Sequence, residues 1–409
     1  MHESAILLLL IGASVSAVSA SQMTRVHAFG VGAGGSNLYA GLIVDSSGNL
    51  YGVTEAGGAY GYGIVFELSP TGTGGWSETV LYNFKGGTQD GTGPHATLFR
   101  DNAGDLYGTT VSGGLNHQSC NGGCGIAFEL TPSGGGWQET VLYHFSGGAD
   151  GRVPYAGVTV DSAGNVYGAT IAGGASDAGA VYKLTPGASG WTQTVLYSFK
   201  GRPDGVNPYA TPILDSGGNL YGTANAGGTS NNGIVYELMP QGEGEWAERV
   251  LHNFGGGTDG AEPLTNGVIF DANGNLYGTT QEGGSGLYGI AYQLAPTASG
   301  LWTETILHSF LGVPARDAGY PNGVIFDDRG NLWGTSSGGG IDNPGTIFKI
   351  VPTGGSWKET VMFSFTGQST GVYPSATLVM DPSGQFYGTT LWGGPTGTTT
   401  GGVAFQFTP

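Results

Sequence analysis

A stretch that reads V-I-F-D-A-N-G-N-L-Y-G-T-T, from Val268 to Thr280, decides the fold because the chain repeats it seven times. The aromatic-glycine pair inside it recurs every 54 to 60 residues. Spacing of this kind is typical of repeat architectures, in which each unit buries its apolar face against its neighbours. The seven pairs are Tyr51-Gly52, Tyr107-Gly108, Tyr167-Gly168, Tyr221-Gly222, Tyr277-Gly278, Trp333-Gly334 and Tyr387-Gly388.

Each repeat divides into four apolar segments separated by turn residues, and we expect each segment to be a β-strand. The first, such as residues 41–45, ends in Asp-x-x-Gly. The carboxylate can accept backbone N–H groups there, and the glycine permits the positive φ of a tight hairpin. A metal-binding role for these aspartates is disfavoured because all seven repeats carry them. The second strand is L-Y-G-T-T, and its glycine predicts a close backbone approach or a bulge.

The second half of each repeat supplies two further strands. The third, G-I-V-F-E-L from Gly63, alternates in character and is followed by a proline, Pro70, which we expect to end it. The fourth begins at a tryptophan such as Trp76. No segment has a sustained 3.6-residue apolar period, so helix should be nearly absent.

The strand count at the two ends of the chain predicts a closed ring. The first three strands occur seven times, but the tryptophan-led fourth strand occurs six times. Residues 24–29, T-R-V-H-A-F, align with the fourth strand at residues 79–84, so an N-terminal strand can complete the last repeat. Closure protects strand edges from other chains. We therefore predict an all-β, seven-bladed β-propeller with four antiparallel strands per blade. The alternative, an open solenoid, would end in atypical capping repeats.

Composition and the N-terminal residues indicate where the protein is located and which classes of partner are disfavoured. The 409-residue chain has 82 glycines, 12 Lys plus Arg and a net charge of −18, so it lacks the basic surface that binds nucleic acid. Residues 1–20 contain an apolar run and end in Val18-Ser19-Ala20, which is typical of a secretory signal peptide. We expect residues 21–409 to form a single secreted domain, extracellular or periplasmic, that is monomeric and has no membrane span.

Two cysteines lie in the loop H-Q-S-C-N-G-G-C-G. In an oxidising compartment this glycine-containing loop can close Cys120 and Cys124 into a disulfide, which is the interpretation we favour. The alternative is a metal site formed by His117 and both thiolates, and it lacks a fourth ligand.

The combination of D-x-x-G-N-L-Y-G-T-T, Gly-Gly and G-x-V-F-x-L resembles the GloVer (Gloeobacter/Verrucomicrobia) tandem repeat over essentially the whole chain after residue 20. Through D-x-x-G-N-[LV]-Y it is more distantly similar to NHL-type propeller repeats. The GloVer resemblance implies an exported bacterial protein, often with a C-terminal surface anchor, although this sequence stops at Pro409 after its last predicted strand. The family has no established catalytic residues to carry over.

The connections between repeats carry a recurring D-G-x-x-P. Its aspartate and glycine are typical of a turn that leads into an inner strand. A second interpretation is a ring of carboxylates near the channel mouth that binds Ca²⁺, a cation that prefers oxygen ligands. The aspartates concerned are Asp90, Asp150, Asp204, Asp259 and Asp317.

Aromatic residues stand beside these prolines, at the predicted start of the inner strands. They could form a collar on which sugar rings stack, with charged neighbours as hydrogen-bonding groups, or they could simply pack between blades. Residues that depart from the repeat are the better functional candidates. The candidate ligand-binding residues are His95, His117, Arg152, Tyr155, Arg202, Tyr209, Glu262, Arg316, Tyr320, Tyr373 and Trp392.

These features favour a secreted binding or scaffold module, with polysaccharide as the expected ligand class. Two alternatives stay open, because the propeller fold hosts many functions. One is a carbohydrate-active hydrolase or lyase that uses carboxylates at the channel mouth. The other is a platform that binds another secreted or surface protein. No catalytic residue can be named from the sequence, and no cofactor is indicated except for the Ca²⁺ considered above.

Overall fold

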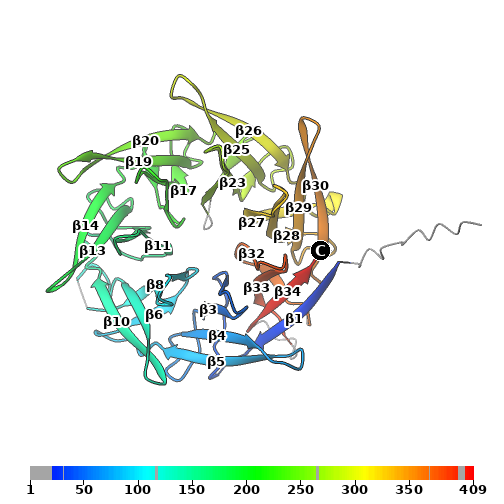
Figure 1. Cartoon of the computed structure of the whole chain (residues 1–409). Helices are drawn as coiled ribbons and strands as arrows, with labels where there is room; N and C mark the ends of the chain where they lie inside the picture. Colours follow the sequence, from blue (N-terminus) through cyan, green and yellow to red (C-terminus); the bar gives the residue numbers. More distant parts are fainter. Residues whose placement is uncertain (1–20, 31, 116–117, 264–266, 368, 395–400) are drawn as a thin grey trace, which may run out of the picture.

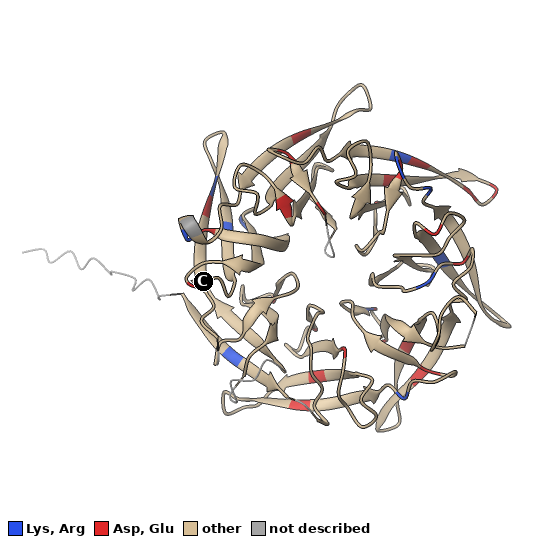
Figure 2. Ribbon diagram, turned by 180° about the vertical axis from the view of Figure 1, so that it is seen from behind, with Lys and Arg blue, Asp and Glu red and all other residues tan. Residues whose placement is uncertain are grey.

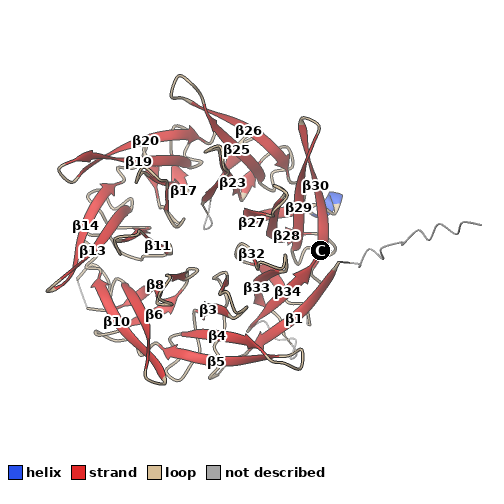
Figure 3. Cartoon of the chain, in the orientation of Figure 1, coloured by secondary structure: helices blue, strands red, loops and turns tan. Residues whose placement is uncertain are grey.

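The fold is a ring of seven antiparallel sheets (Figure 1). The computed structural model describes residues 21–30, 32–115, 118–263, 267–367, 369–394 and 401–409. Strands dominate these residues, and their single helical element is the short 3-10 helix η1 (Val313–Ala315) (Figure 3). The predicted seven-bladed β-propeller is therefore confirmed. Among the residues described, no helix has the length and apolar character needed to cross a membrane, and the expected signal peptide, residues 1–20, lies outside them.

The four strands of each blade correspond to the four segments of the repeat, and the blades are numbered here in chain order. The innermost strands are β2 (Ile43–Val44), β7 (Phe99–Arg100), β11 (Val158–Val160), β16 (Ile213–Leu214), β22 (Val268–Phe270), β27 (Ala318–Phe326) and β32 (Val379–Met380). The second strands are β3 (Leu50–Thr54), β8 (Leu106–Gly113), β12 (Val166–Thr170), β17 (Leu220–Ala224), β23 (Leu276–Thr280), β28 (Leu332–Gly339) and β33 (Phe386–Trp392).

The outer half of each blade is built in the same way. The third strands are β4 (Ile64–Pro70), β9 (Ile126–Ser133), β13 (Ala180–Gly187), β19 (Ile234–Gly242), β25 (Ile290–Pro296), β29 (Thr346–Thr353) and β34 (Gly402–Thr408). The outermost strands are β5 (Trp76–Asn83), β10 (Gly136–His144), β14 (Gly190–Ser198), β20 (Glu245–Asn253), β26 (Trp302–Ser309), β30 (Ser356–Ser364) and β1 (Gln22–Phe29). Short strands in the connections are β6 (Gly91–Pro94), β15 (Gly205–Val206), β18 (Ala226–Gly227), β21 (Gly260–Ala261), β24 (Glu282–Gly283) and β31 (Val372–Pro374).

The N-terminal strand closes the ring, as the strand count predicted. β1 pairs antiparallel with β34, the last strand of the chain, from Gln22 opposite Thr408 to Phe29 opposite Gly402. The blue and red ends of the chain lie side by side in Figure 1. β1 thus supplies the fourth strand of the seventh blade and covers the edge that β34 would otherwise expose.

Aromatic pairs join each blade to the next. A phenylalanine at the end of the outermost strand packs on an aromatic ring of the third strand in the following blade, as Phe254 does on Tyr292 with centroids 5.3 Å apart. All seven of these phenylalanines are buried. The pairs are Phe84–Phe128, Phe145–Tyr182, Phe199–Tyr236, Phe254–Tyr292, Phe310–Phe348, Phe365–Phe405 and Phe29–Phe66.

The Asp-x-x-Gly segments form tight hairpins, as expected. In the first blade Asp45 Oδ1 accepts hydrogen bonds from the N–H groups of Ser47 and Asn49, at 2.8 and 2.9 Å. Gly48 has a φ of 83°, which favours glycine. The hydroxyl of Tyr51, the aromatic residue of the repeat, donates to Asp45 Oδ2 at 3.1 Å. The aspartate therefore fixes both the turn and the neighbouring strand.

The glycine that follows this tyrosine allows the close approach that the sequence predicted. A Cβ placed on Gly52 would lie 2.6 Å from Cζ of Phe66, the buried ring of the third strand. A side chain at this position would push that ring out of its contact with the adjacent blade.

Pro70 ends its third strand, as expected, although other third strands continue past their prolines. Pro70 is the last residue of β4 and pairs with Trp76, and β9 continues past Pro132 to Ser133. β3 pairs with β4 only from Leu50, opposite Leu68. Pro70 therefore faces a partner strand on one side only, and an edge position tolerates a residue without an N–H.

The Gly-Gly loops and the connections between blades lie on one face of the ring. The second glycine of each pair donates a hydrogen bond to the incoming connection, as from Gly114 N to Asp90 O at 2.8 Å. Gly58, Gly174, Gly228, Gly284 and Gly340 make the equivalent bond. This face therefore carries the connections with the candidate site residues.

Candidate ligand-binding site

A cavity of about 470 Å³ lies on the axis of the ring, lined by residues from all seven blades. Its walls come from the segments that lead into the innermost strands and from the residues that follow the second strands. None of its described lining residues is Asp, Glu, Lys or Arg. The cavity is therefore a neutral site in an acidic protein.

Part of the cavity wall is formed by aromatic rings of the first three blades, and a fourth ring, Tyr209, packs on the last of them without lining the cavity. The ring of Tyr39 stacks on that of His95 with centroids 4.2 Å apart, and His95 meets Tyr155 at 3.9 Å. Tyr155 in turn makes an edge contact with Tyr209 at 5.0 Å. We call these four residues the aromatic arc. Part of each ring is used in packing against its neighbours, as the structural interpretation of the collar anticipated.

Hydrogen bonding fixes the centre of the arc. The Tyr155 hydroxyl lies 2.8 Å from His95 Nε2. Burial lowers the pKa of the His95 imidazole to about 4, and burial raises the pKa of the Tyr155 hydroxyl. Both groups are therefore neutral at pH 7, so Tyr155 can donate its proton to Nε2. This arrangement holds the rings without placing a charge in the cavity.

Part of the cavity wall is polar. Asn322, Ser337 and Ser375 come from the sixth and seventh blades. Asn322 Nδ2 donates to the carbonyl oxygen of Pro374 at 2.6 Å, and Ser375 Oγ donates to that of Leu38 at 2.7 Å. Ser337 Oγ donates to the carbonyl oxygen of Tyr320 at 3.2 Å. We call Asn322, Ser337 and Ser375 the polar arc.

Glu55 is the carboxylate at the mouth of the site. It lines a second, outer pocket of about 360 Å³ that shares Tyr39, His95 and Tyr155 with the axial cavity. Asn37 Nδ2 donates to Glu55 Oε2 at 3.3 Å. Burial raises the pKa of the Tyr39 hydroxyl, and the negative charge of Glu55 raises it further.

Two tyrosines that the sequence grouped with the collar occupy a different position. Tyr320 and Tyr373 precede the proline of their connections and have left-handed backbones, with φ of 57° and 56°. Tyr320 packs on Tyr288 at 5.3 Å, and Tyr373 packs on Trp392 at 5.4 Å. Tyr373 lines the axial cavity, as His95 and Tyr155 do, whereas Tyr209 and Tyr320 do not, so only part of the predicted collar lines the site.

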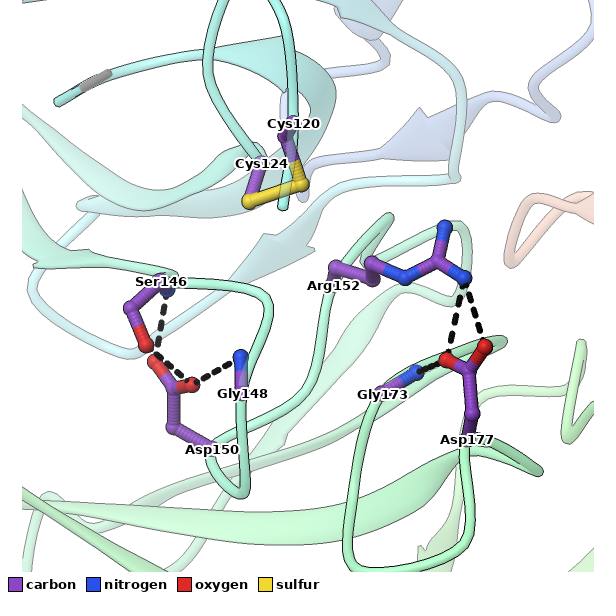
Figure 4. The surroundings of a disulfide bond; sticks show 8 residues. All are labelled: Cys120, Cys124, Ser146, Gly148, Asp150, Arg152, Gly173 and Asp177. Atoms are coloured by element: carbon purple, nitrogen blue, oxygen red, sulfur yellow. Dashed lines mark hydrogen bonds and ion pairs between the residues drawn. A yellow bond between two sulfur atoms is a disulfide. The ribbon is translucent and has the colours of Figure 1, made fainter. Parts of the chain in front are cut away.

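The charged candidates lie apart from the cavity lining. Arg152 forms a two-pronged ion pair with Asp177 at 2.9 Å, and the Arg202 guanidinium donates to the Thr229 carbonyl oxygen at 2.6 Å (Figure 4 shows the first pair). Burial raises the pKa of Glu262, with a further contribution from Glu282. Arg316 follows η1. His117 lies outside the described residues. Figure 2 shows the Lys and Arg positions scattered around the ring.

The aspartates of D-G-x-x-P lie between the outermost strands of adjacent blades rather than in the cavity lining. Asp150 accepts hydrogen bonds from the Ser146 and Gly148 N–H groups, at 2.7 and 3.2 Å (Figure 4). Its Oδ2 also accepts from the hydroxyl of Tyr143 on β10. Asp90, Asp204, Asp259 and Asp317 have equivalent partners in their own blades. Five separate turns hold these carboxylates.

The structure joins Cys120 and Cys124 in a disulfide, which Figure 4 shows. The bond lies beside Gly147 in the connection that contains Asp150, because a Cβ on that glycine would lie 2.7 Å from Cys124 Sγ. Both thiols are therefore bonded to each other.

Sequence reasoning missed Tyr39, Glu55 and the polar arc. Tyr39 stands two residues before Gly41, as His95 stands two before Thr97 and Tyr155 two before Gly157. The first repeat lacks D-G-x-x-P, so a search guided by that motif passes over it. Counting back from the start of the inner strand would have found it.

Comparison with known proteins agrees with the repeat and the fold. Residues 114–316 match the family described as Gloeobacter/Verrucomicrobia repeat. No curated protein matches the chain by sequence. Among solved structures, a proposed 6-phosphogluconolactonase from Bacteroides uniformis ATCC 8492 has a TM-score of 0.50 and 14% identity, over 85% of this chain and 88% of that one. A protein of unknown function from Dyadobacter fermentans DSM 18053 has a TM-score of 0.43 and 11% identity, over 94% and 99%.

At 14% identity, the Bacteroides uniformis structure supports the fold alone. The family match and the propeller together confirm the resemblance that the motifs indicated. Residues 114–316 therefore belong to the Gloeobacter/Verrucomicrobia repeat family, and the described residues fold as a seven-bladed propeller.

Proposed function

We propose that this protein is a secreted binding module that recognises neutral polysaccharide at the axial cavity. The observation that carries the proposal is one cavity lined both by Tyr39, His95 and Tyr155 of the aromatic arc and by the polar arc. Pyranose rings offer apolar faces that stack on aromatic side chains and hydroxyls that bond to amide and hydroxyl groups. A binding or scaffold role also agrees with the repeat family.

The charge of the site favours a neutral sugar over a uronic acid or a sulfated sugar. The lining contains neither Lys nor Arg among its described residues, and Glu55 lies at its mouth. With a net charge of −18, the whole protein repels an anionic chain. Recognition would therefore depend on stacking and hydrogen bonds, which keep their strength in salt.

A glycan array followed by calorimetry tests the proposal. We expect Tyr39→Ala and Tyr155→Ala each to weaken binding of a neutral oligosaccharide about 5-fold, because a lost stacking contact is worth about 1 kcal/mol. Tyr60→Ala is the matched control, since Tyr60 is 55% exposed and lies outside the cavity lining. Binding that is absent, or equal in all variants, would contradict the proposal.

The same protein preparation separates the alternatives. Release of new reducing ends from the bound glycan would identify a carbohydrate-active enzyme, and a stable complex with another exported protein would identify an interaction platform.

Export is part of the proposal. We expect a mature chain that starts at Ser21 in the periplasm or medium; an uncleaved cytosolic chain would contradict it.

A further inference from the structure

A repeated polar cluster lies between the outermost strands of adjacent blades, away from the axial cavity. It joins a residue of one outermost strand, the aspartate of the following D-G-x-x-P connection, and a glutamate of the next outermost strand. We call this cluster a seam triad. Two seam triads contain tyrosine, Tyr82–Asp90–Glu139 and Tyr197–Asp204–Glu248, and two contain histidine, His252–Asp259–Glu304 and His308–Asp317–Glu359.

The tyrosine triads hold themselves together by hydrogen bonds. The Tyr82 hydroxyl lies 3.0 Å from Asp90 Oδ2 and 3.4 Å from Glu139 Oε2. One hydroxyl proton serves two carboxylates, and burial raises the pKa of Glu139 to about 7. The hydroxyl thus bridges Asp90 Oδ2 and Glu139 Oε2, while Glu139 Oε1 has no hydrogen-bond partner among the described residues.

The triad of His252, Asp259 and Glu304 has the same frame but wider spacing. His252 Nε2 lies 3.5 Å from Asp259 Oδ2 and 3.7 Å from Glu304 Oε1. His252 Nε2 is shielded from solvent and has no hydrogen-bond partner among the described residues, which sets this triad apart from the tyrosine triads; Glu304 Oε1 also has none, as Glu139 Oε1 has none. The side chains of His252 and Glu304 are 19% and 15% exposed. Two buried polar atoms therefore point at one another across a gap.

That gap has the size of a metal coordination sphere. Two ligands bound to one ion at about 2.1 Å, at the tetrahedral angle, lie about 3.4 Å apart. The three ligand atoms of this triad all lie within 4.8 Å of one another. The donor set of one imidazole and two carboxylates matches the nitrogen and oxygen ligands of catalytic-type zinc sites, which keep a fourth position for solvent.

We propose that His252, Asp259 and Glu304 bind a divalent transition-metal ion of the zinc class between the fourth and fifth blades. The ion links β20 to β26 and adds a cross-link to the ring. Calcium fits this triad poorly, because Ca²⁺ requires six to eight oxygen ligands and takes no imidazole. The inference does not depend on glycan binding.

The repeat itself supplies the test variants. His252→Tyr recreates the tyrosine triad, and Glu304→Gln places the residue found at the equivalent Gln193. Calorimetric titration with Zn²⁺, and Co²⁺ absorption spectra for coordination, should show one site in the parent protein. We expect each variant to weaken this site at least about 10-fold, because even outer-shell partners of metal ligands are worth about 10- to 100-fold. Both variants should keep the parent circular dichroism spectrum.

Two outcomes would overturn the proposal. One is Zn²⁺ affinity that is unchanged in both variants, which would mean adventitious binding to the acidic surface. The other is loss of the site in His308→Tyr with full retention in His252→Tyr, which would assign the ion to the neighbouring seam. In that seam His308 Nε2 lies 3.0 Å from Asp317 Oδ2, at hydrogen-bonding distance. Ca²⁺ added at the same concentration should not compete.

Discussion

Deletion of residues 21–30 should lower the melting temperature by at least about 5 °C and make the protein aggregate. The deletion removes β1, whose Val26 and Phe29 are buried against the seventh and first blades. Lost side-chain burial and strand pairing together should cost at least about 5 kcal/mol. For a chain of this length, each kcal/mol corresponds to about 1 °C. The exposed edge of β34 would then pair with other molecules.

A permuted chain provides the matched control. β1 lies antiparallel to β34 with Gln22 opposite Thr408, so the two strands are the third and fourth strands of an ordinary blade. Joining them through the four residues that connect Pro352 to Trp357 in the sixth blade would make this hairpin continuous, with a new N-terminus at Gly32. We expect the permuted protein to melt near the parent temperature. Equal melting of the deletion variant and the parent, with both monomeric, would contradict ring closure.

The repeat made the fold predictable because its constraints are local and recur in every blade. Asp45 and Gly48 specify a hairpin, and the alternation of the third strand specifies a buried face. Closure followed from counting, because the only missing fourth strand had a counterpart in residues 24–29. The pairing of Pro70 with Trp76 was not predicted, since the absence of a second-strand partner beyond Leu68 is a property of the assembled sheet.

The candidate site was predictable only in part, because the residue type at one position of the repeat varies. His95, Tyr155 and Tyr209 were found directly after their prolines, and the structure brings them together. Asn322 and Ser375 occupy the same position, but their small polar side chains did not mark them as candidates. Tyr320 and Tyr373 precede the prolines, two residues earlier in the repeat, where the backbone is left-handed.

The seam triads were also predictable from the sequence only in part. The aspartate of D-G-x-x-P was recognised, but its partner is a glutamate of the next blade, as for Asp259 and Glu304. His252 was interpreted as a substitute for tyrosine, which is its position in the repeat. Its proximity to two carboxylates depends on the packing of one blade against the next, and the spacing of residues within a repeat does not encode that packing.

Substitution of the phenylalanines that join adjacent blades should show that the contact between the seventh and first blades, the closing seam, stabilises the protein as much as the contacts between the other blades. We expect Phe254→Ala, in an internal seam, and Phe29→Ala, in the closing seam, each to cost about 3–5 kcal/mol, because both leave a cavity beside a buried ring. The melting temperature should fall by about 5 °C in each case. Leu301→Ala is the control, since Leu301 is 70% exposed.

The comparison between the two phenylalanine variants is more informative than the loss of stability in either variant alone. Phe29 reaches Phe66 of the first blade at 4.7 Å although 37 positions separate them in the chain, and Phe254 reaches Tyr292 at 5.3 Å across 38. The contacts are geometrically alike, but Phe29 lies on a strand that is joined to its blade by hydrogen bonds alone. If β1 detached readily, Phe29→Ala would cost much less than Phe254→Ala. Equal losses, measured by calorimetry on both variants, would mean that the non-covalent closure is as firm as the covalently connected blades.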